Sequence, residues 1–220
     1  MLYFANPKNG PVNDAIRAGE LGATVTPDQG NAIPDGAVWF ADNGRYSGQI
    51  GPGGIPLVGD LAPRWHGDLW FTAWLAKRRP MADRCLFVVA PDQPFDMAAT
   101  LPLSVRWSTV IERMGYRPAL ALQDGAEDMR IPWAQFGAVF IGGTDQWKIG
   151  PAASHLIREA RARGMHAHMG RVNSLRRLRQ AWGMGCDSVD GGWFRRHPQR
   201  LADAQAALRD LERNGAQWLV

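Results

Sequence analysis

The feature that most constrains the fold is a repeated alternation of short apolar runs with amphipathic stretches of helical period. Continuous apolar runs of this length are typical of parallel strands that are buried on both faces. Eight runs qualify: 2–5, 23–26, 38–42, 86–90, 119–123, 138–141, 166–169 and 188–190. Repeated βα units with eight strands predict an α/β fold, a compact TIM-like (β/α)8 barrel, with a doubly wound open sheet as the alternative.

The expected helices are clearest in the last third of the chain. Pro151 can open a helix that stops at Gly164, and Ser174 can cap the helix that follows. A last helix is expected from Pro198 to the Asn214-Gly215 pair, with leucines repeated along one face.

Composition limits the possible architectures further. At 220 residues and 45% hydrophobic content, the chain can bury one full core, so we expect residues 1–220 to form a single domain. No run approaches the ~20 apolar residues of a membrane helix. The first residues lack a basic region followed by an apolar one, so we expect a cytoplasmic protein without membrane association. Cys85 and Cys186 lie in separate apolar runs, which indicates buried reduced thiols rather than a zinc site.

Positive charge is concentrated in one part of the chain. From residue 151 onward, 12 Arg and Lys face 6 Asp and Glu, whereas residues 1–150 hold 13 against 15. Such an uneven distribution is typical of a protein with a phosphate-bearing partner. The candidate phosphate contacts are Lys148, Arg171, Arg176, Arg177, Arg195 and Arg196. A solvated helix face is the alternative interpretation of these arginines.

Polar residues and glycines follow the predicted strands at their carboxyl ends, which meet on one face of a barrel. The set comprises Asp42, Asp92, Gln123, Gly142, Gly143 and Asp190. Displacing a base at a glycosidic carbon needs one carboxylate as nucleophile and another for proton transfer. Aspartate can accept hydrogen bonds from a purine edge, and a glutamine side chain or a glycine N–H can donate to an exocyclic oxygen. The alternative is that Asp and Gly simply begin turns after strands.

The order and spacing of these motifs resemble the tRNA-guanine transglycosylase (queuine tRNA-ribosyltransferase) superfamily. The similar segments are 42–44 (D-S-G-G in the family), 123–125 (V-Q-G-G), 142–143 (G-G-L), 168–172 (M-G-V-G) and 185–190 (G-I-D-M-F-D). Their order and approximate spacing hold over residues 38–192, and the resemblance implies the same barrel fold.

The resemblance also implies a role for each matched residue. Asp190 would be the nucleophile that forms a covalent glycosyl-enzyme after guanine leaves, and Asp42 would be the general acid/base. The implied base-binding residues are Asp92, Gln123, Gly142 and Gly143, with the Gly143 N–H meeting the exocyclic oxygen. Asp187 competes with Asp190, but these two positions of a strand point to opposite sides. The strand-end location and the resemblance both favour Asp190.

The sequence also departs from the family pattern. Asn43 and Arg45 occupy the second and fourth positions of the D-S-G-G turn, and the C-terminal zinc-binding Cys/His cluster is missing. This leaner form resembles the phage and bacterial relatives that install 7-deazaguanine derivatives in DNA. The resemblance therefore implies DNA rather than tRNA, and a free 7-deazaguanine base, as partners. We expect no metal or cofactor, and a homodimer is possible.

The sequence thus predicts a base-exchange transglycosylase that replaces guanine in nucleic acid. A hydrolytic nucleosidase or N-glycosidase barrel, using Asp42 and Asp190 as a carboxylate pair, is the first alternative. A non-catalytic nucleic-acid-binding barrel is the second. The glycine-rich stretch 44–54 is expected to form either a lid over the base or a floppy connection.

Overall fold

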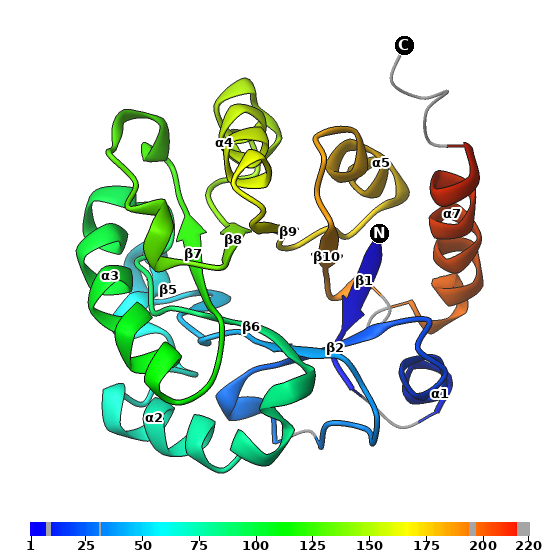
Figure 1. Cartoon of the computed structure of the whole chain (residues 1–220), viewed down its shortest axis with the longest axis horizontal. Helices are drawn as coiled ribbons and strands as arrows, with labels where there is room; N and C mark the ends of the chain where they lie inside the picture. The colour runs from blue at the N-terminus through cyan, green and yellow to red at the C-terminus, as the bar shows by residue number, and fades with distance from the viewer. Residues whose placement is uncertain (8–9, 31, 194–196, 215–220) are drawn as a thin grey trace.

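Eight parallel strands form the centre of the protein in a computed structural model, which describes residues 1–7, 10–30, 32–193 and 197–214. The strands are β1 (Leu2–Ala5), β2 (Gly22–Val25), β3 (Trp39–Ala41), β6 (Cys85–Val89), β7 (Pro118–Leu122), β8 (Ala138–Ile141), β9 (His166–Met169) and β10 (Ser188–Asp190). They close into a barrel in the order β1-β10-β9-β8-β7-β6-β3-β2 (Figure 1). The closed ring confirms the predicted barrel and excludes the open sheet.

Each strand lies within one residue of the apolar run that predicted it. The reason is visible in β7, whose residues are all buried because they face the barrel interior and the outer helices alternately. Inside the barrel, the ring of Phe40 lies 4.9 Å from that of Phe87 and 5.1 Å from that of Phe4, measured between centroids. Small residues of β7 and β8, including Ala119 and Ala138, complete this cluster. Large and small side chains therefore fill the interior together.

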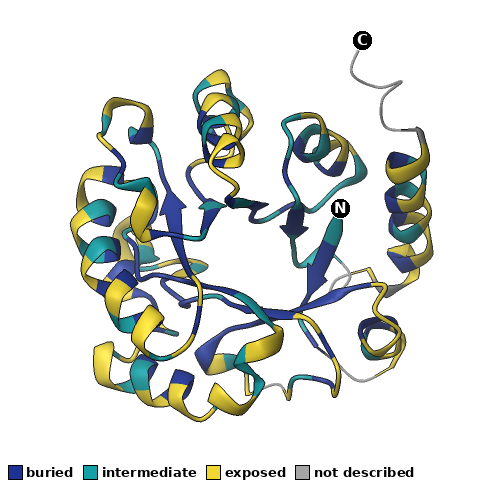
Figure 2. Ribbon diagram, in the orientation of Figure 1, coloured by how far each residue is buried: buried dark blue, intermediate teal, exposed yellow. Residues whose placement is uncertain are grey.

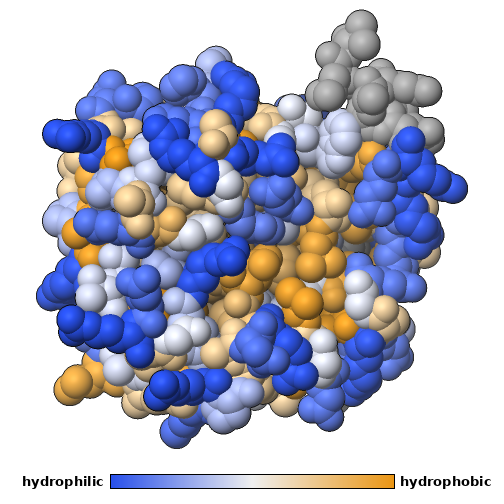
Figure 3. All heavy atoms as spheres, viewed as in Figure 1, coloured by the Kyte–Doolittle hydropathy of each residue, from blue (hydrophilic) through white to orange (hydrophobic). Residues whose placement is uncertain are grey.

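The outer layer contains α1 (Pro11–Arg17), α2 (Asp68–Ala76), α3 (Met97–Arg113), α4 (Pro151–Ala162), α5 (Leu175–Gly183) and α7 (Leu201–Asn214). Pro151 begins α4, as predicted, and the Ser174 side chain caps α5 by accepting a hydrogen bond from the backbone N–H of Arg177. The helices turn their buried faces toward the barrel and their exposed faces outward (Figure 2). Hydrophilic side chains accordingly dominate the periphery in Figure 3, and apolar ones show nearer the middle.

Two connections between consecutive barrel strands contain no α-helix in their described residues. β2 is joined to β3 through the 3-10 turn η1 (Pro27–Gln29), and β7 is joined to β8 through η5 (Ala126–Asp128) and η6 (Trp133–Gln135). Replacing helices by short turns shortens the chain that the barrel needs. It explains how a full ring of strands fits within 220 residues.

The glycine-rich stretch after β3 forms a hairpin. Its strands are β4 (Tyr46–Ile50) and β5 (Pro56–Val58), which pair antiparallel and are joined by η2 (Pro52–Gly54). Because the hairpin follows the carboxyl end of β3, it stands on the face of the barrel where active sites occur. The stretch is therefore ordered rather than a floppy connection, and its proposed closure over a base stays a prediction.

The cysteines are both free thiols. Cys186 is buried, as expected, whereas Cys85 is half-buried, and burial raises the pKa of Cys186 to about 12. Within the described ranges, none of the helices combines the length and apolar character that crossing a membrane requires.

Candidate active site

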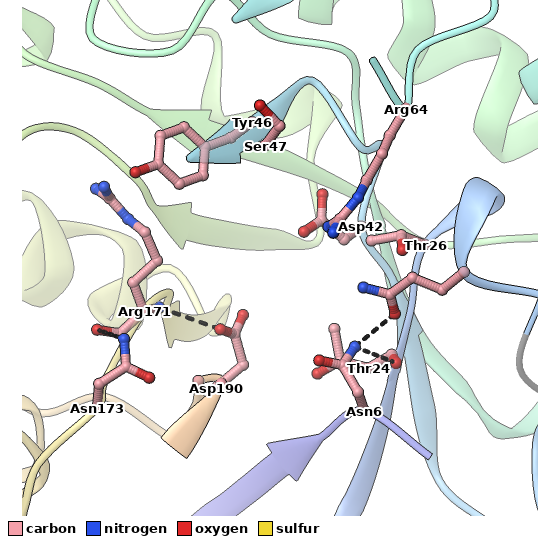
Figure 4. Close-up of a pocket in the computed structure, with 13 residues that line it drawn as sticks. Asn6, Thr24, Thr26, Asp42, Tyr46, Ser47, Arg64, Arg171, Asn173 and Asp190 are labelled. Atoms are coloured by element: carbon pink, nitrogen blue, oxygen red, sulfur yellow. Dashed lines mark hydrogen bonds between the residues drawn. The ribbon is translucent and has the colours of Figure 1, made fainter. Parts of the chain in front are cut away.

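Two adjoining cavities open at the carboxyl ends of the barrel strands, and Asp42, Tyr46, Arg171 and Asp190 line both. One, which we call the polar cavity, has a volume of about 290 Å³ and is also lined by Asn6, Thr24, Thr26, Gln29, Ser47, Arg64, Asn173, Gly191 and Gly192 (Figure 4). The other, the narrow pocket, has about 70 Å³ and is also lined by Asn43, Val89, Asp92, Pro94, Phe95, Gln123, Phe140, Gly142 and Gly143. In the described part of the chain, no cluster of three or more His, Cys, Asp or Glu side chains could hold a metal ion.

A hydrogen-bond network joins the walls of the narrow pocket. Asp92 accepts from Asn43 Nδ2 at 2.9 Å and from Gln123 Nε2 at 2.6 Å. Gln123 Oε1 in turn accepts from the backbone N–H of Gly143 at 2.6 Å and that of Phe95 at 3.0 Å. The structure therefore brings the predicted base-binding groups together, but it pairs their polar atoms with one another.

The two glycines of this network allow close backbone approach. A Cβ atom on Gly142 would lie 2.6 Å from Gln123 Nε2. Gly143 has a φ of 64°, a left-handed conformation that disfavours side chains, and a Cβ there would lie 2.4 Å from the Trp147 ring. Larger residues at either position would push Gln123 or the β8 turn out of place.

Asp42 lies at the end of β3 and faces both cavities. Shielding from bulk water raises its pKa to about 7, and the nearby carboxylates of Asp190 and Asp92 act in the same direction. The hydrogen bond that Asp42 Oδ1 accepts from the Gly44 N–H, at 3.0 Å, opposes the shift, as does the charge of Arg64. A carboxyl group with a pKa near neutrality can both donate and accept a proton at physiological pH.

Asn43 and Arg45, the departures from the family turn, hold the segment that carries Asp92. Asn43 Nδ2 donates to Ala90 O as well as to Asp92 Oδ1, at 2.9 Å in both cases. Arg45 is buried and donates through Nε to the Asp92 carbonyl at 2.5 Å and through a terminal nitrogen to Asp60 Oδ1 at 2.7 Å. Burial raises the pKa of Asp92, while the Asn43 hydrogen bond and the Arg45 charge lower it. These contacts anchor the β3 turn to the residues that follow β6.

Only one of the two competing aspartates faces the cavities. Asp190 Oδ1 accepts from the backbone N–H of Arg171 at 3.1 Å, Oδ2 lies 3.1 Å from His168 Nε2, and the side chain is 13% exposed. Asp187 does not line either cavity: its Oδ2 accepts from the Ala167 N–H at 2.9 Å, and its Oδ1 lies 3.3 Å from an Arg161 nitrogen. The alternation expected along the strand therefore places Asp190, and not Asp187, at the site.

Arg171 covers the narrow pocket instead of reaching away from the protein. Its guanidinium donates to the Gly143 carbonyl and lies 4.7 Å from the centroid of the Tyr46 ring and 5.7 Å from that of Phe95. Figure 4 shows the side chain extending from the β9 end toward Tyr46. The backbone of Arg171 has a φ of 59°, which is uncommon for a residue with a side chain. This conformation lets its N–H contact Asp190 while its side chain covers the pocket.

The polar cavity differs in its hydrogen bonding. Within the described residues, the buried side-chain oxygens of Thr24, Thr26 and Asn173 have no protein hydrogen-bond partner. Asn6 is held by Gln29, whose Oε1 accepts from Asn6 Nδ2 at 2.6 Å. Three lining residues of this cavity thus hold an oxygen that is shielded from solvent and unpaired among the described residues.

The remaining predicted phosphate contacts are placed differently from one another. Lys148 was expected at a phosphate, but its side chain is 0% exposed, donates to the Gly170 carbonyl at 3.0 Å and lies 3.3 Å from Asp145. Burial lowers its pKa to about 8. Arg177 pairs with Asp145 at 2.6 Å, and Arg176 is exposed in the first turn of α5. Arg195 and Arg196 lie outside the described residues.

Comparison with known proteins adds little to this geometry. No family model matches the chain, and no curated protein matches its sequence. A crystal structure of tryptophan synthase from M. tuberculosis, in its open form, is similar with a TM-score of 0.38 and 16% identity, over 92% of this chain and 94% of that one. This likeness is too distant to bear on activity, and the barrel rests on the strand order described above.

Several residues of the site carry only a weak sequence signal, among them Tyr46 and His168. Tyr46 lines both cavities, and its only signal was an aromatic residue that closely follows the Asp42 turn. His168 contacts Asp190 from the neighbouring strand. Its signal was a pair of histidines, His166 and His168, alternating in an otherwise apolar strand.

Proposed function

We propose that this protein is a guanine transglycosylase that exchanges guanine in nucleic acid for a 7-deazaguanine derivative through a covalent aspartyl intermediate. The observation that supports it is convergence: motifs from the ends of separate strands line one narrow pocket. They are Asp42, Asp92, Gln123, Gly142, Gly143 and Asp190, and each follows or ends a strand of apolar residues in the sequence.

The proposed reaction has two halves that share one carboxylate pair. In the first, an Asp190 oxygen attacks C1′ of the target nucleotide, the bond from C1′ to the base nitrogen breaks, and its electron pair leaves with guanine. Asp42 gives its proton to the departing base. In the second half, Asp42 takes a proton from the incoming 7-deazaguanine, whose ring nitrogen attacks C1′ and releases Asp190. A pKa of about 7 suits Asp42 to both proton transfers.

Base binding in this scheme requires a rearrangement of the narrow pocket. At about 70 Å³ it is much smaller than the ~300 Å³ at which ligand pockets usually begin. The guanidinium of Arg171 must therefore move away from Gly143 and Tyr46. The exocyclic oxygen of the base then replaces Gln123 Oε1 as the acceptor of the Gly143 N–H, and the base edge donates to Asp92.

The polymer is proposed to approach from the side of the polar cavity. Arg64 and Asn173 line this cavity together with Asp190, and the sugar and its phosphates would lie there. Preference for DNA over tRNA follows only from the resemblance to the compact relatives, and it is part of the proposal.

The test is to incubate the protein with labelled 7-deazaguanine derivatives and either DNA or tRNA. Label in DNA supports the proposal in full, and label in tRNA alone would retain the chemistry but overturn the polymer preference. Abasic sites without label would favour a hydrolytic N-glycosidase. Binding without either product would favour a non-catalytic nucleic-acid-binding barrel. Asp190→Asn serves as the chemical control, because the amide cannot attack the sugar.

A further inference from the structure

A chain of hydrogen bonds runs inside the barrel and ends on Asp190. His166 Nε2 lies 2.7 Å from Ser188 Oγ, Ser188 Oγ lies 2.7 Å from His168 Nδ1, and His168 Nε2 lies 3.1 Å from Asp190 Oδ2. We call these three residues, His166, Ser188 and His168, the relay. The reaction proposed above uses none of them. The resemblance does not imply the relay either, because the family segment G-I-D-M-F-D has methionine at the position of Ser188.

The surroundings of His168 hold its ring in one orientation. The residue is 0% exposed, and its ring lies 4.6 Å from Phe40, 5.1 Å from Phe140, 5.3 Å from Phe87 and 5.8 Å from Phe4, between centroids. An imidazole among phenyl rings is costly unless both of its nitrogens are hydrogen-bonded. The contacts to Ser188 and Asp190 satisfy both nitrogens, so packing and hydrogen bonding fix the same ring position.

The directions of the hydrogen bonds follow from the carboxylate. An ionised Asp190 can only accept, so His168 Nε2 must donate to it. In the neutral ring, Nδ1 then accepts, and the Ser188 hydroxyl donates to it. The Ser188 oxygen is left to accept from His166 Nε2. Burial and the neighbouring His168 lower the pKa of His166 to about 4, so this ring is neutral at physiological pH, as the arrangement requires.

We infer that His168 is a positioning residue for Asp190, and that Ser188 and His166 reinforce the tautomer that the carboxylate selects. Asp190 then receives one N–H on each oxygen, from His168 on Oδ2 and from the Arg171 backbone on Oδ1, both at 3.1 Å. Two donors on separate oxygens fix the plane of the carboxylate. The role rests on the proposed function, because only that function makes Asp190 a nucleophile.

The charged groups around the relay belong to several elements. His168 faces Asp190 on β10 and His166 on its own strand. His166 also faces Asp187 before β10, Arg117 before β7 and Arg161 on α4. Asp190 faces Asp42 beyond β3. A change in pH therefore acts on the relay through these groups together, and the tautomer is best measured directly at one pH.

The first test uses no substrate. In protein with 15N-labelled histidine, nitrogen NMR at pH 7 is expected to show His168 neutral, protonated on Nε2 and unprotonated on Nδ1. Ser188→Ala removes the donor to Nδ1, and we expect the His168 signals to move toward a mixture of tautomers. A wild-type His168 protonated on Nδ1, or on both nitrogens, would overturn the inference whatever the protein's activity.

The second test uses base exchange. His168→Leu keeps the volume but removes the donor, and kcat is expected to fall about 10- to 100-fold, the effect of losing one hydrogen bond to a charged group, with KM for the polymer unchanged. His168→Gln can place an N–H near the position of Nε2 and should recover most of the lost kcat. His155→Gln, an exposed histidine on α4 that lines neither cavity, is the matched control and should match wild type.

The outcomes separate the two proposals. If wild type exchanges bases and His168→Leu stays within twofold of its kcat, the positioning role is overturned and the proposed function stands. If wild type exchanges no base, the proposed function fails, and the NMR measurement still decides whether the relay has the inferred tautomer. Should His168→Leu fail to fold, His168→Gln and Ser188→Ala carry the test: unchanged tautomer signals and unchanged kcat in Ser188→Ala would overturn the inference.

Discussion

The narrow pocket and the polar cavity share the same two aspartates but differ in how their other polar groups are bonded. In the narrow pocket, Asp92, Gln123 and Gly143 bond to one another. In the polar cavity, buried oxygens of Thr24 and Thr26 have no protein partner in the described structure. A ligand in the narrow pocket must replace existing hydrogen bonds, whereas the buried threonine oxygens of the polar cavity have no hydrogen bonds to replace within the described residues. On the proposed function, the pocket would discriminate between bases and the cavity would face the polymer.

The largest effect is expected at the boundary between the two cavities. Asp190→Asn should lower base exchange by about 10³-fold or more, because an amide of the same shape cannot attack the sugar. Polymer binding and thermal stability should change little. Asp187→Asn is the control, since Asp187 faces neither cavity, and it should keep its activity. If Asp190→Asn keeps more than a few per cent of the wild-type exchange rate, another residue is the nucleophile.

Removing the paired groups of the narrow pocket should alter selectivity. Asp92→Ala and Gln123→Ala are expected to weaken discrimination for guanine-type bases by about 1–3 kcal/mol, measured as the ratio of kcat/KM for competing bases. Gln123→Ala should also lower the unfolding free energy, because the N–H groups of Gly143 and Phe95 lose their acceptor. Gln135→Ala, on the exposed η6 turn, is the control. Unchanged selectivity in both variants would remove these residues from base recognition.

The raised pKa of Asp42 predicts a pH-dependent stability. Its pKa is about 7 in the folded protein against 3.8 without the fold, so ionising it costs stability as pH rises through that interval. Asp42→Asn should therefore gain on wild type by about 1–2 kcal/mol between pH 4 and pH 7.5, after allowing for the solvent that reaches the cavity. Chemical unfolding at both pH values measures this. Asp203→Asn makes the same change at an exposed site of α7 and should show no such gain.

A smaller difference in unfolding free energy is expected between unpaired and paired threonines. Thr26→Val should leave the unfolding free energy unchanged or raise it by up to about 1 kcal/mol, because a buried hydroxyl without a partner is lost. Thr100→Val removes a buried hydroxyl that is bonded to both backbone groups of Gln93, at 2.9 Å each, and should lower stability by about 1–2 kcal/mol. Equal losses in the two variants would contradict the difference between paired and unpaired sites. Weaker polymer binding in Thr26→Val would place the polymer in the polar cavity.

The smallest effect is expected for Arg176 and Arg177 on α5, in the salt dependence of polymer binding. Each phosphate contact contributes about 0.9 to the log–log salt slope of duplex binding and about 0.7 for single strands. Replacing both Arg176 and Arg177 with alanine should flatten the slope by up to two such contributions and weaken all sequences alike. Arg177 already pairs with Asp145, so Arg176→Ala alone should account for most of the change. An identical slope in wild type and variant would make this pair an ordinary solvated helix face.

The strands and the site motifs were predictable from the sequence because both leave local signals. The run at 138–141 is apolar at every position, as burial on both faces demands, and its bounds match β8. The run at 166–169 is apolar except for His166 and His168, and its bounds match β9. The polar residues that end these strands had to meet, since parallel strands in a ring place their carboxyl ends on one face. Alternation along β10 likewise separated Asp190 from Asp187.

Pairing between distant residues could not be predicted in this way. Lys148 has the local context of a surface cation, and its burial depends on Asp145 and on the Gly170 carbonyl 22 positions away. Gln123 and Gly143 were each assigned to a base, and their bond to each other depends on the turns after β7 and β8. The glycine-rich stretch at 44–54 predicted a lid or a connection without regular structure. The structure instead has the antiparallel pair β4 and β5 at 46–58.

The position of Asp190 on β10 has a consequence for the synthesis of the protein. This strand pairs with β1 on one side and with β9 on the other, so it completes the ring. It is also the last barrel strand to leave the ribosome, because chains emerge amino terminus first. On the proposed mechanism, a nascent chain that ends before residue 188 has an open sheet and lacks the nucleophile Asp190. The proposed reactivity toward nucleic acid therefore arrives together with the closed barrel, and no translation product that ends before Asp190 carries it.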